Sequence, residues 1–104
     1  MKILNKQIIG AYANVMLDIM ENNPSKENTK NISETIEDLY LTLDKNYCLK
    51  FSEDEKKEYA EVYNILDKLS TAATVSFIRG EVIDFDNDEV FKGLIQLVQL
   101  GKED

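Results

Sequence analysis

The stretch from Ser52 to Gly80, SEDEKKEYAEVYNILDKLSTAATVSFIRG, most constrains what this chain can fold into, because it has the pattern of one long helix. Ser52 and Glu55 have the spacing of a capping box, in which the serine hydroxyl and the glutamate carboxylate bind free amides at a helix start. Gly80 follows the last periodic residue, where a residue in the left-handed conformation commonly ends a helix. The pattern predicts a helix over residues 52–79, roughly 40 Å long at ~1.5 Å per residue.

Apolar side chains recur along this stretch at spacings of three and four, which places them on one face of the helix. They are Tyr59, Val62, Tyr63, Leu66, Leu69, Ala73 and Phe77. From Ser70 to Ser76 the side chains are almost all small, so another helix can approach this part closely. That helix can belong to this chain, to a second copy or to a partner, and the sequence leaves these alternatives open.

A first helix is predicted over residues 2–22, and it stops before Pro24 because the residue preceding a proline disfavours helical angles. Gly10 inside it indicates the close approach of a neighbouring backbone. The predicted apolar stripe comprises Ile3, Leu4, Ile8, Tyr12, Val15, Met16, Ile19 and Met20.

A second helix is predicted to follow the polar connection 24–31 and to end near Lys45. Thr29, Asn31 and Ser33 are its candidate caps. Residues 46–51 read as a short apolar link. Within this link we expect Tyr47, Leu49 and Phe51 to close one end of the bundle.

The last helix is expected to begin at a cap formed by Asp86 or Asn87 and to end before Gly101. The side chains of the preceding residues Val82, Ile83 and Phe85 are expected to pack against the core of the bundle. Apolar residues cover all but one narrow strip of this helix, so it is either central in the fold or presents a surface to another chain. The apolar face expected to bind a partner comprises Phe91, Leu94, Ile95 and Val98.

These segments predict an all-α fold, a compact four-helix up-down bundle with one long central helix (about 52–79), in a single domain covering residues 1–104. No apolar run reaches the ~20 residues that a membrane-spanning helix needs. The single cysteine cannot form an internal disulfide, and the N-terminus does not resemble a signal peptide. We therefore expect a cytoplasmic protein that does not enter membranes.

The net charge of −8 is unevenly distributed, because residues 1–33 carry four bases and three acids whereas residues 34–104 carry eight bases and 17 acids. Direct nucleic-acid binding is disfavoured, because it needs a basic surface against the phosphates. An acidic surface instead favours a basic partner, such as a protein with a nucleic-acid-binding groove. The candidate acidic contact residues are Glu34, Glu37, Asp38, Glu81, Asp84, Asp86, Asp88 and Glu89.

The residue types that most often perform catalysis are scarce. The absence of histidine removes the commonest general base and most zinc sites. Cys48 lies between Tyr47 and Leu49, which predicts a buried and inert thiol. Asp84, Asp86 and Asp88 resemble the first three ligand positions of an EF-hand calcium loop, but Glu89 and Ile95 stand where that loop has its glycine and its last glutamate. We expect no catalytic residue, metal site or cofactor.

A second carboxylate pattern carries an alternative. It consists of Asp54-Glu55-x-x-Glu58, then 22 residues, then Glu81-x-x-Asp84. This pattern resembles the acidic signature of all-helical nucleotide pyrophosphohydrolases of the MazG and dimeric dUTPase kind. The resemblance implies magnesium ions held by carboxylates against a nucleoside triphosphate, with a metal-held water attacking phosphorus.

The favoured hypothesis is a small, acidic, non-enzymatic protein-interaction module that binds and modulates another protein. Lysine outnumbers arginine eleven to one, a bias typical of AT-rich genomes, so a phage- or mobile-element-encoded inhibitor of a host or defence protein fits this hypothesis. The alternatives are a structural protein that forms a homodimer or larger oligomer, and the magnesium-dependent pyrophosphohydrolase.

Overall fold

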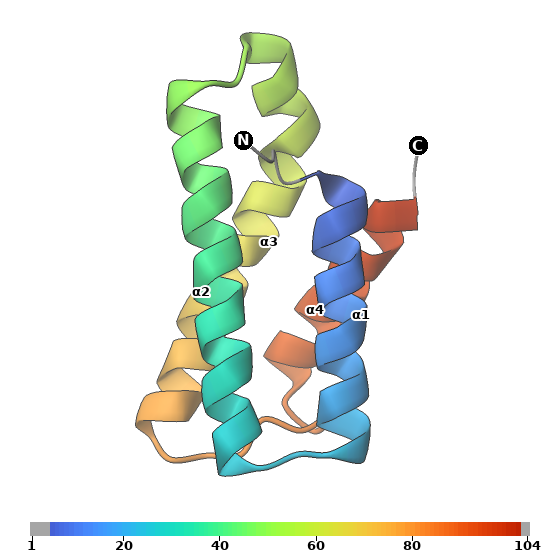
Figure 1. The fold of residues 1–104 in the computed structure, drawn as a ribbon, viewed down its shortest axis with the longest axis vertical. Coiled ribbons are helices and arrows are strands. Elements are labelled where there is room, and N and C mark those ends of the chain that lie inside the picture. Colours follow the sequence, from blue (N-terminus) through green and yellow to red (C-terminus); the bar gives the residue numbers. More distant parts are fainter. Residues whose placement is uncertain (1–4, 103–104) are drawn as a thin grey trace.

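The computed structural model describes residues 5–102, which form four helices that run alternately up and down (Figure 1). The helices are α1 (Lys6–Asn22), α2 (Lys26–Leu49), α3 (Glu53–Ile78) and α4 (Asp88–Lys102). The described residues contain no strand. The predicted all-α up-down bundle with one long helix is therefore confirmed.

The helices pack as two antiparallel pairs, α1 with α4 and α2 with α3. The pairs meet mainly where α3 contacts α4, whereas α1 and α2 contact each other at few positions. The fully buried side chains come from all four helices and from the loop before α4. They include Ile9, Met20, Ile36, Leu43, Val62, Leu66, Leu69, Ile83, Leu94 and Leu97.

Local signals define both ends of α3 as predicted. The Ser52 hydroxyl accepts the Glu55 amide at 3.2 Å, and the Glu55 carboxylate accepts the Ser52 amide at 3.0 Å. At the other end Gly80 has φ 72°, while the Glu81 amide donates to the Ser76 carbonyl and the Gly80 amide to the Phe77 carbonyl. These are the two hydrogen bonds of a Schellman motif, which needs a left-handed residue after the helix.

The pair α1 and α4 crosses at two glycines. A β-carbon on Gly10 would lie 3.1 Å from the Gly101 α-carbon, and one on Gly101 would lie 2.9 Å from the Lys6 carbonyl oxygen. Gly10 thus allows the close approach that its position indicated. Gly101 does not end α4, because the helix continues to Lys102, two residues beyond the predicted end.

Helix α2 is longer at both ends than predicted. It begins after Ser25, whose hydroxyl accepts the Asn28 amide, so the expected caps lie inside the helix. It ends at Leu49, because residues 46–49 of the predicted link continue the helix. Tyr47 stacks there on Tyr63 of α3. Leu49 is 73% exposed and does not close the bundle, whereas Tyr47 and Phe51 are half-buried.

Two inward faces also differ from prediction. On α1 the buried residues are Ile9, Gly10, Ala13, Met16 and Met20, while Tyr12 and Val15 are exposed. The face is rotated because α1 is covered by α4 and hardly by α2. Phe77 is also exposed, because Ala73 and Ser76 occupy the buried side at this end of α3. Helix α1 begins at Lys6 with Asn5 as its cap, and residues 2–4 of the predicted helix lie outside the described residues.

Candidate protein-interaction site

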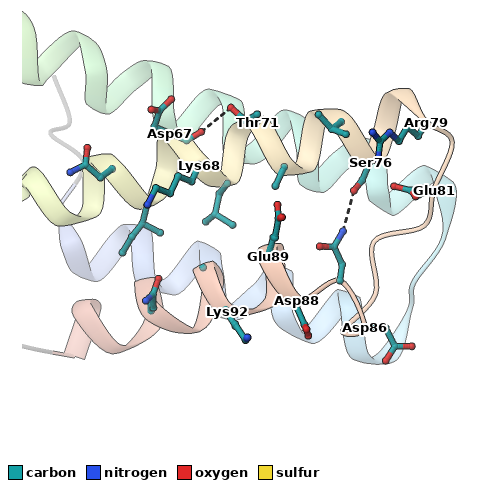
Figure 2. A pocket seen from close by; sticks show the side chains of 18 of the residues that line it. Asp67, Lys68, Thr71, Ser76, Arg79, Glu81, Asp86, Asp88, Glu89 and Lys92 are labelled. Carbon is teal, nitrogen blue, oxygen red and sulfur yellow. Dashed lines mark hydrogen bonds between the residues drawn. The ribbon is translucent and has the colours of Figure 1, made fainter.

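An open groove of about 1080 Å³ runs along the seam between α3 and α4, and we call it the α3–α4 groove (Figure 2). Its lining extends from Glu61 to Arg79 on the α3 side and from Asp86 to Gln96 on the α4 side. At ~1.5 Å per residue these segments span roughly 27 Å and 15 Å. The groove therefore has the length of a few helical turns.

Small side chains in the seam explain why the surface is hollow here. Ala72, Ser76 and Gly93 line the groove, and their side chains fill little of the space between the two helices. Leu69 packs so tightly over Gly93 that a β-carbon at Gly93 would lie 2.5 Å from the Leu69 Cδ2 atom. The half-buried Ile65 and the exposed Val75 add apolar surface to the α3 side.

The lining of the groove carries more negative than positive charge. Its carboxylates are those of Glu61, Asp67, Glu81, Asp86, Asp88 and Glu89, and its cations are Lys68, Arg79 and Lys92. Glu89 points from α4 across the groove toward α3 (Figure 2). Among residues 5–102 the ion pairs are Lys30–Glu34 and Lys56–Glu53, so none of the groove carboxylates has a basic side chain within 4.0 Å. These carboxylates are open to a cationic partner.

Exposed apolar side chains gather at the end of the bundle where α3 ends. Of the nine large apolar side chains that are exposed in the described residues, five fall within residues 75–85. Val75 lines the groove, and the other four, which we call the end patch, are Phe77, Ile78, Val82 and Phe85. This end also carries the acids of the loop before α4, so apolar and acidic groups occur together there.

Hydrogen bonds from three elements fix the loop that carries the end patch. The Ile83 amide donates to the Thr29 hydroxyl of α2 at 2.8 Å, and the Ile83 side chain is buried. The Asn87 side chain caps α4 by accepting the Val90 amide, and it donates to the Ser76 hydroxyl of α3 at 3.1 Å. Of the two cap candidates that the sequence offered, Asp86 and Asn87, it is therefore Asn87 that caps α4. Val82 and Phe85 do not tuck in as predicted, because only Ile83 reaches the core.

The predicted acidic contact residues fall into two groups. Glu81, Asp86, Asp88 and Glu89 line the groove, whereas Glu34, Glu37 and Asp38 are exposed on α2, which contributes nothing to the groove. Asp84 is half-buried, and its carboxylate accepts the Asp86 amide at 3.0 Å. Asp84 therefore has a local role in shaping the loop.

The apolar face predicted on α4 is mostly part of the core. Leu94 is fully buried, and Phe91, Ile95 and Val98 are half-buried. Helix α4 packs on α1 and also on α3, so two sides of its apolar surface are covered within the chain. Leu94 cannot contact a partner in this fold, and the end patch exposes more apolar surface than this face of α4 does.

The two carboxylate patterns do not form metal sites in this fold. Asp54 and Glu55 lie in the first turn of α3, while Glu81 and Asp84 lie beyond its other end. From Glu58, the last residue of the first half, α3 continues for 20 residues to Ile78, which separates the two halves by about 30 Å. In the EF-hand-like pattern, Asp84 accepts an amide and Asp88 begins α4. Within residues 5–102 no group of three or more acidic or cysteine side chains is arranged to hold a metal ion.

The opposite end of the bundle is aromatic. The rings of Tyr47 and Tyr63 stack with centroids 4.5 Å apart, and the ring of Tyr40 also stacks with Tyr63, at 5.6 Å. The Tyr63 hydroxyl donates to Asp44, and this hydrogen bond, followed by one to Tyr40, raises the pKa of Tyr63 above its ordinary value of 10.0. Burial followed by the charge of Glu58 raises the pKa of Tyr59.

Cys48 is exposed on α2, which contradicts the predicted buried thiol. Its side chain points away from the core because the buried positions in this turn of α2 are Leu43 and Asn46. The Cys48 thiol lies 3.7 Å from the Asp44 carboxylate, in hydrogen-bonding geometry.

Sequence reasoning missed the end patch and the α4 side of the groove, whereas it singled out part of the α3 side. The stretch from Ser70 to Ser76 was a usable signal, because four of its small residues, Thr71, Ala72, Val75 and Ser76, line the groove. Gly93 on α4 was the matching signal, and only the fold places it against Leu69, directly before that stretch. The spacing of apolar residues could not predict that Ile78 and Phe85 are exposed, because Ile78 is the last residue of α3 and Phe85 lies in the loop after it.

The fold and the site together define an all-helical bundle with an acidic groove beside an apolar end. Comparisons of the chain with protein-family models, with curated proteins and with solved structures each gave no match. No helix among the described residues has the length and apolar character needed to cross a membrane.

Proposed function

We propose that this protein is an acidic protein-interaction module that binds and modulates a basic protein partner. The observation that carries the proposal is the gathering of exposed apolar side chains at one end of the bundle, next to carboxylates that have no basic partner within the described residues. Exposed apolar side chains clustered among polar groups are typical of interaction sites.

The two kinds of surface have different roles in this proposal. Carboxylates of the groove attract a basic partner and orient it, because complementary charges raise association rates and disfavour acidic competitors. The end patch, with Ile78 and Phe85 as its more exposed members, supplies apolar contact area. A phage- or mobile-element-encoded inhibitor of a nucleic-acid-binding protein is one form that such a module takes.

Capture of a partner by surface variants tests this proposal. Purified protein is immobilised and incubated with lysate of a low-GC Gram-positive bacterium, and bound proteins are identified by mass spectrometry. The double variant Ile78→Ser/Phe85→Ser removes apolar area from the end patch. The matched control Leu41→Ser/Leu49→Ser removes exposed apolar area from α2.

We expect a partner that the wild type and the control retain and that the end-patch variant loses. The purified partner should then bind wild type directly, and more weakly in 0.5 M salt, where the Debye length is only about 4 Å. A partner retained equally by both variants would contradict the proposal. A stable homo-oligomer in light scattering, with no partner captured, would favour the structural alternative.

A further inference from the structure

We propose that the α3–α4 groove binds one amphipathic helix of the partner, with basic side chains at its flanks and small or apolar side chains toward the seam. This inference rests on the proposed function and specifies which part of the partner is recognised. Helix-in-groove recognition uses apolar anchors at helical spacing, so it requires a groove of helical length with an apolar floor.

The shape of the groove meets that requirement. Ile65, Ala72 and Val75 lie on α3 at spacings of seven and three, on one face of the helix, and the buried Leu69 lines the groove between Ile65 and Ala72. We call these four residues the apolar strip. Gly93 on α4 has no side chain and Ser76 on α3 has a small one, so neither fills the groove between the two helices. A helix laid along this strip extends the bundle, much as α1 and α4 pack closely through their own small residues.

The charge of the groove selects the kind of helix. Six carboxylates and three cationic side chains line it, and Glu61, Asp67 and Glu89 stand beside the apolar strip. A helix with lysine or arginine on both sides of an apolar stripe places its cations against these carboxylates. A second copy of this chain is a poor occupant, because its net charge of −8 would bring acidic surfaces together.

Designed peptides test the inference directly. The probe is a fluorescein-labelled 18-residue helix with leucine and alanine at helical spacing on one face and lysine on its flanks. One control peptide has the same composition in scrambled order, so it keeps the charge and loses the stripe. Another keeps the stripe and replaces lysine with glutamate. Fluorescence anisotropy measures the dissociation constant of each peptide.

Two pairs of protein variants locate the binding site. Glu61→Lys/Glu89→Lys reverses charge in the groove, and Glu34→Lys/Glu37→Lys makes the same change in net charge on α2. Ala72→Phe fills the groove floor, and Leu41→Phe enlarges an exposed apolar residue on α2 as its control. Circular dichroism and thermal unfolding establish that each variant is folded before binding is measured.

We expect micromolar binding of the amphipathic basic peptide and at least about tenfold weaker binding of both control peptides. The groove charge reversal should weaken binding about tenfold, and the matched reversal on α2 less than about threefold. Ala72→Phe should weaken binding while Leu41→Phe does not.

Three results would overturn the inference. They are no binding of the basic peptide below about 100 µM, equal binding of the scrambled peptide, and equal loss of binding in the two charge-reversal variants. The partner capture described above separates this failure from failure of the proposed function. Suppose that the end-patch variant loses the partner, whereas Glu61→Lys/Glu89→Lys and Ala72→Phe retain it. That result would support the proposed function and contradict binding of a helix in the groove.

Discussion

Gly10 of α1 and Gly101 of α4 meet so closely that a β-carbon added to Gly10 would lie 3.1 Å from the Gly101 α-carbon. The same β-carbon would lie 3.1 Å from the Leu97 carbonyl oxygen. Both neighbours are backbone atoms, so a side chain at Gly10 cannot be accommodated by a change of rotamer. The crossing of α1 and α4 depends on this pair.

Gly10→Ala should therefore destabilise the protein although alanine is the better helix former. Overpacking typically costs about 1–3 kcal/mol, and the gain in helix propensity offsets up to about 1 kcal/mol. We expect a net loss in the free energy of unfolding, measured by urea denaturation. Asn14→Ala, at an exposed position of α1, is the control and should be neutral or slightly stabilising. A Gly10→Ala protein as stable as wild type would show that the helices can separate without cost.

Asn87→Ala removes the cap of α4 and the hydrogen bond to Ser76 in one change. Loss of a cap typically costs about 1 kcal/mol, and loss of the second bond adds to it. Ser76→Ala removes only the bond between α3 and the loop, so it should cost less than Asn87→Ala. Thermal unfolding of both variants measures the difference. Equal losses would mean that the cap contributes nothing.

The raised pKa of Tyr63 predicts how the free energy of unfolding changes at alkaline pH. Its hydrogen bond to Asp44 raises the pKa of Tyr63 in the folded protein, so above pH 10 the folded state holds a proton that the unfolded chain releases. This contribution to the free energy of unfolding is fully present below pH 10 and is lost as pH rises through the folded pKa. Denaturation between pH 8 and pH 11 should show a shallower alkaline decline in Tyr63→Phe than in wild type.

Asp44→Asn separates this hydrogen bond from the stacking of the ring. The variant should lower the pKa of Tyr63 toward its ordinary value, which an ultraviolet titration of tyrosinate detects. Tyr12→Phe, a change at an exposed tyrosine of α1, is the control and should leave the alkaline decline as in wild type. An identical decline in Tyr63→Phe and wild type would contradict the role of Asp44.

Cys48 should react with a thiol reagent in the folded protein, because its side chain is exposed on α2. The rate with a disulfide reagent at pH 8 should fall within a few-fold of the rate in urea. Cys48→Ser should show no reaction and serves as the blank. A thiol that reacts only after unfolding would mean that α2 is covered there by another chain.

The ends of α3 could be predicted from sequence because the residues that form them are close neighbours. Ser52 with Glu55 and Gly80 with the preceding turn act within a few positions of one another. The start of α2 was missed although Ser25 is an equally local cap, because Thr29, Asn31 and Ser33 offered competing candidates in the same polar segment.

Burial on α1 could not be predicted in the same way. Its apolar residues cover more than one face, and the face that is buried depends on which helix covers it. Because α4 covers α1 through Gly10, Ile9 and Ala13 are buried and Tyr12 is exposed. The groove has the same character, since Ala72 and Gly93 form a hollow only when α3 and α4 lie side by side.

The position of Cys48 also determines how the molecule can be studied at an interface. A single thiol on α2, the helix that contributes nothing to the groove, allows the protein to be attached to a gold or maleimide surface in one orientation. Every immobilised molecule is then attached through a helix that does not line the α3–α4 groove. Binding rates measured on such a surface report one homogeneous population of sites.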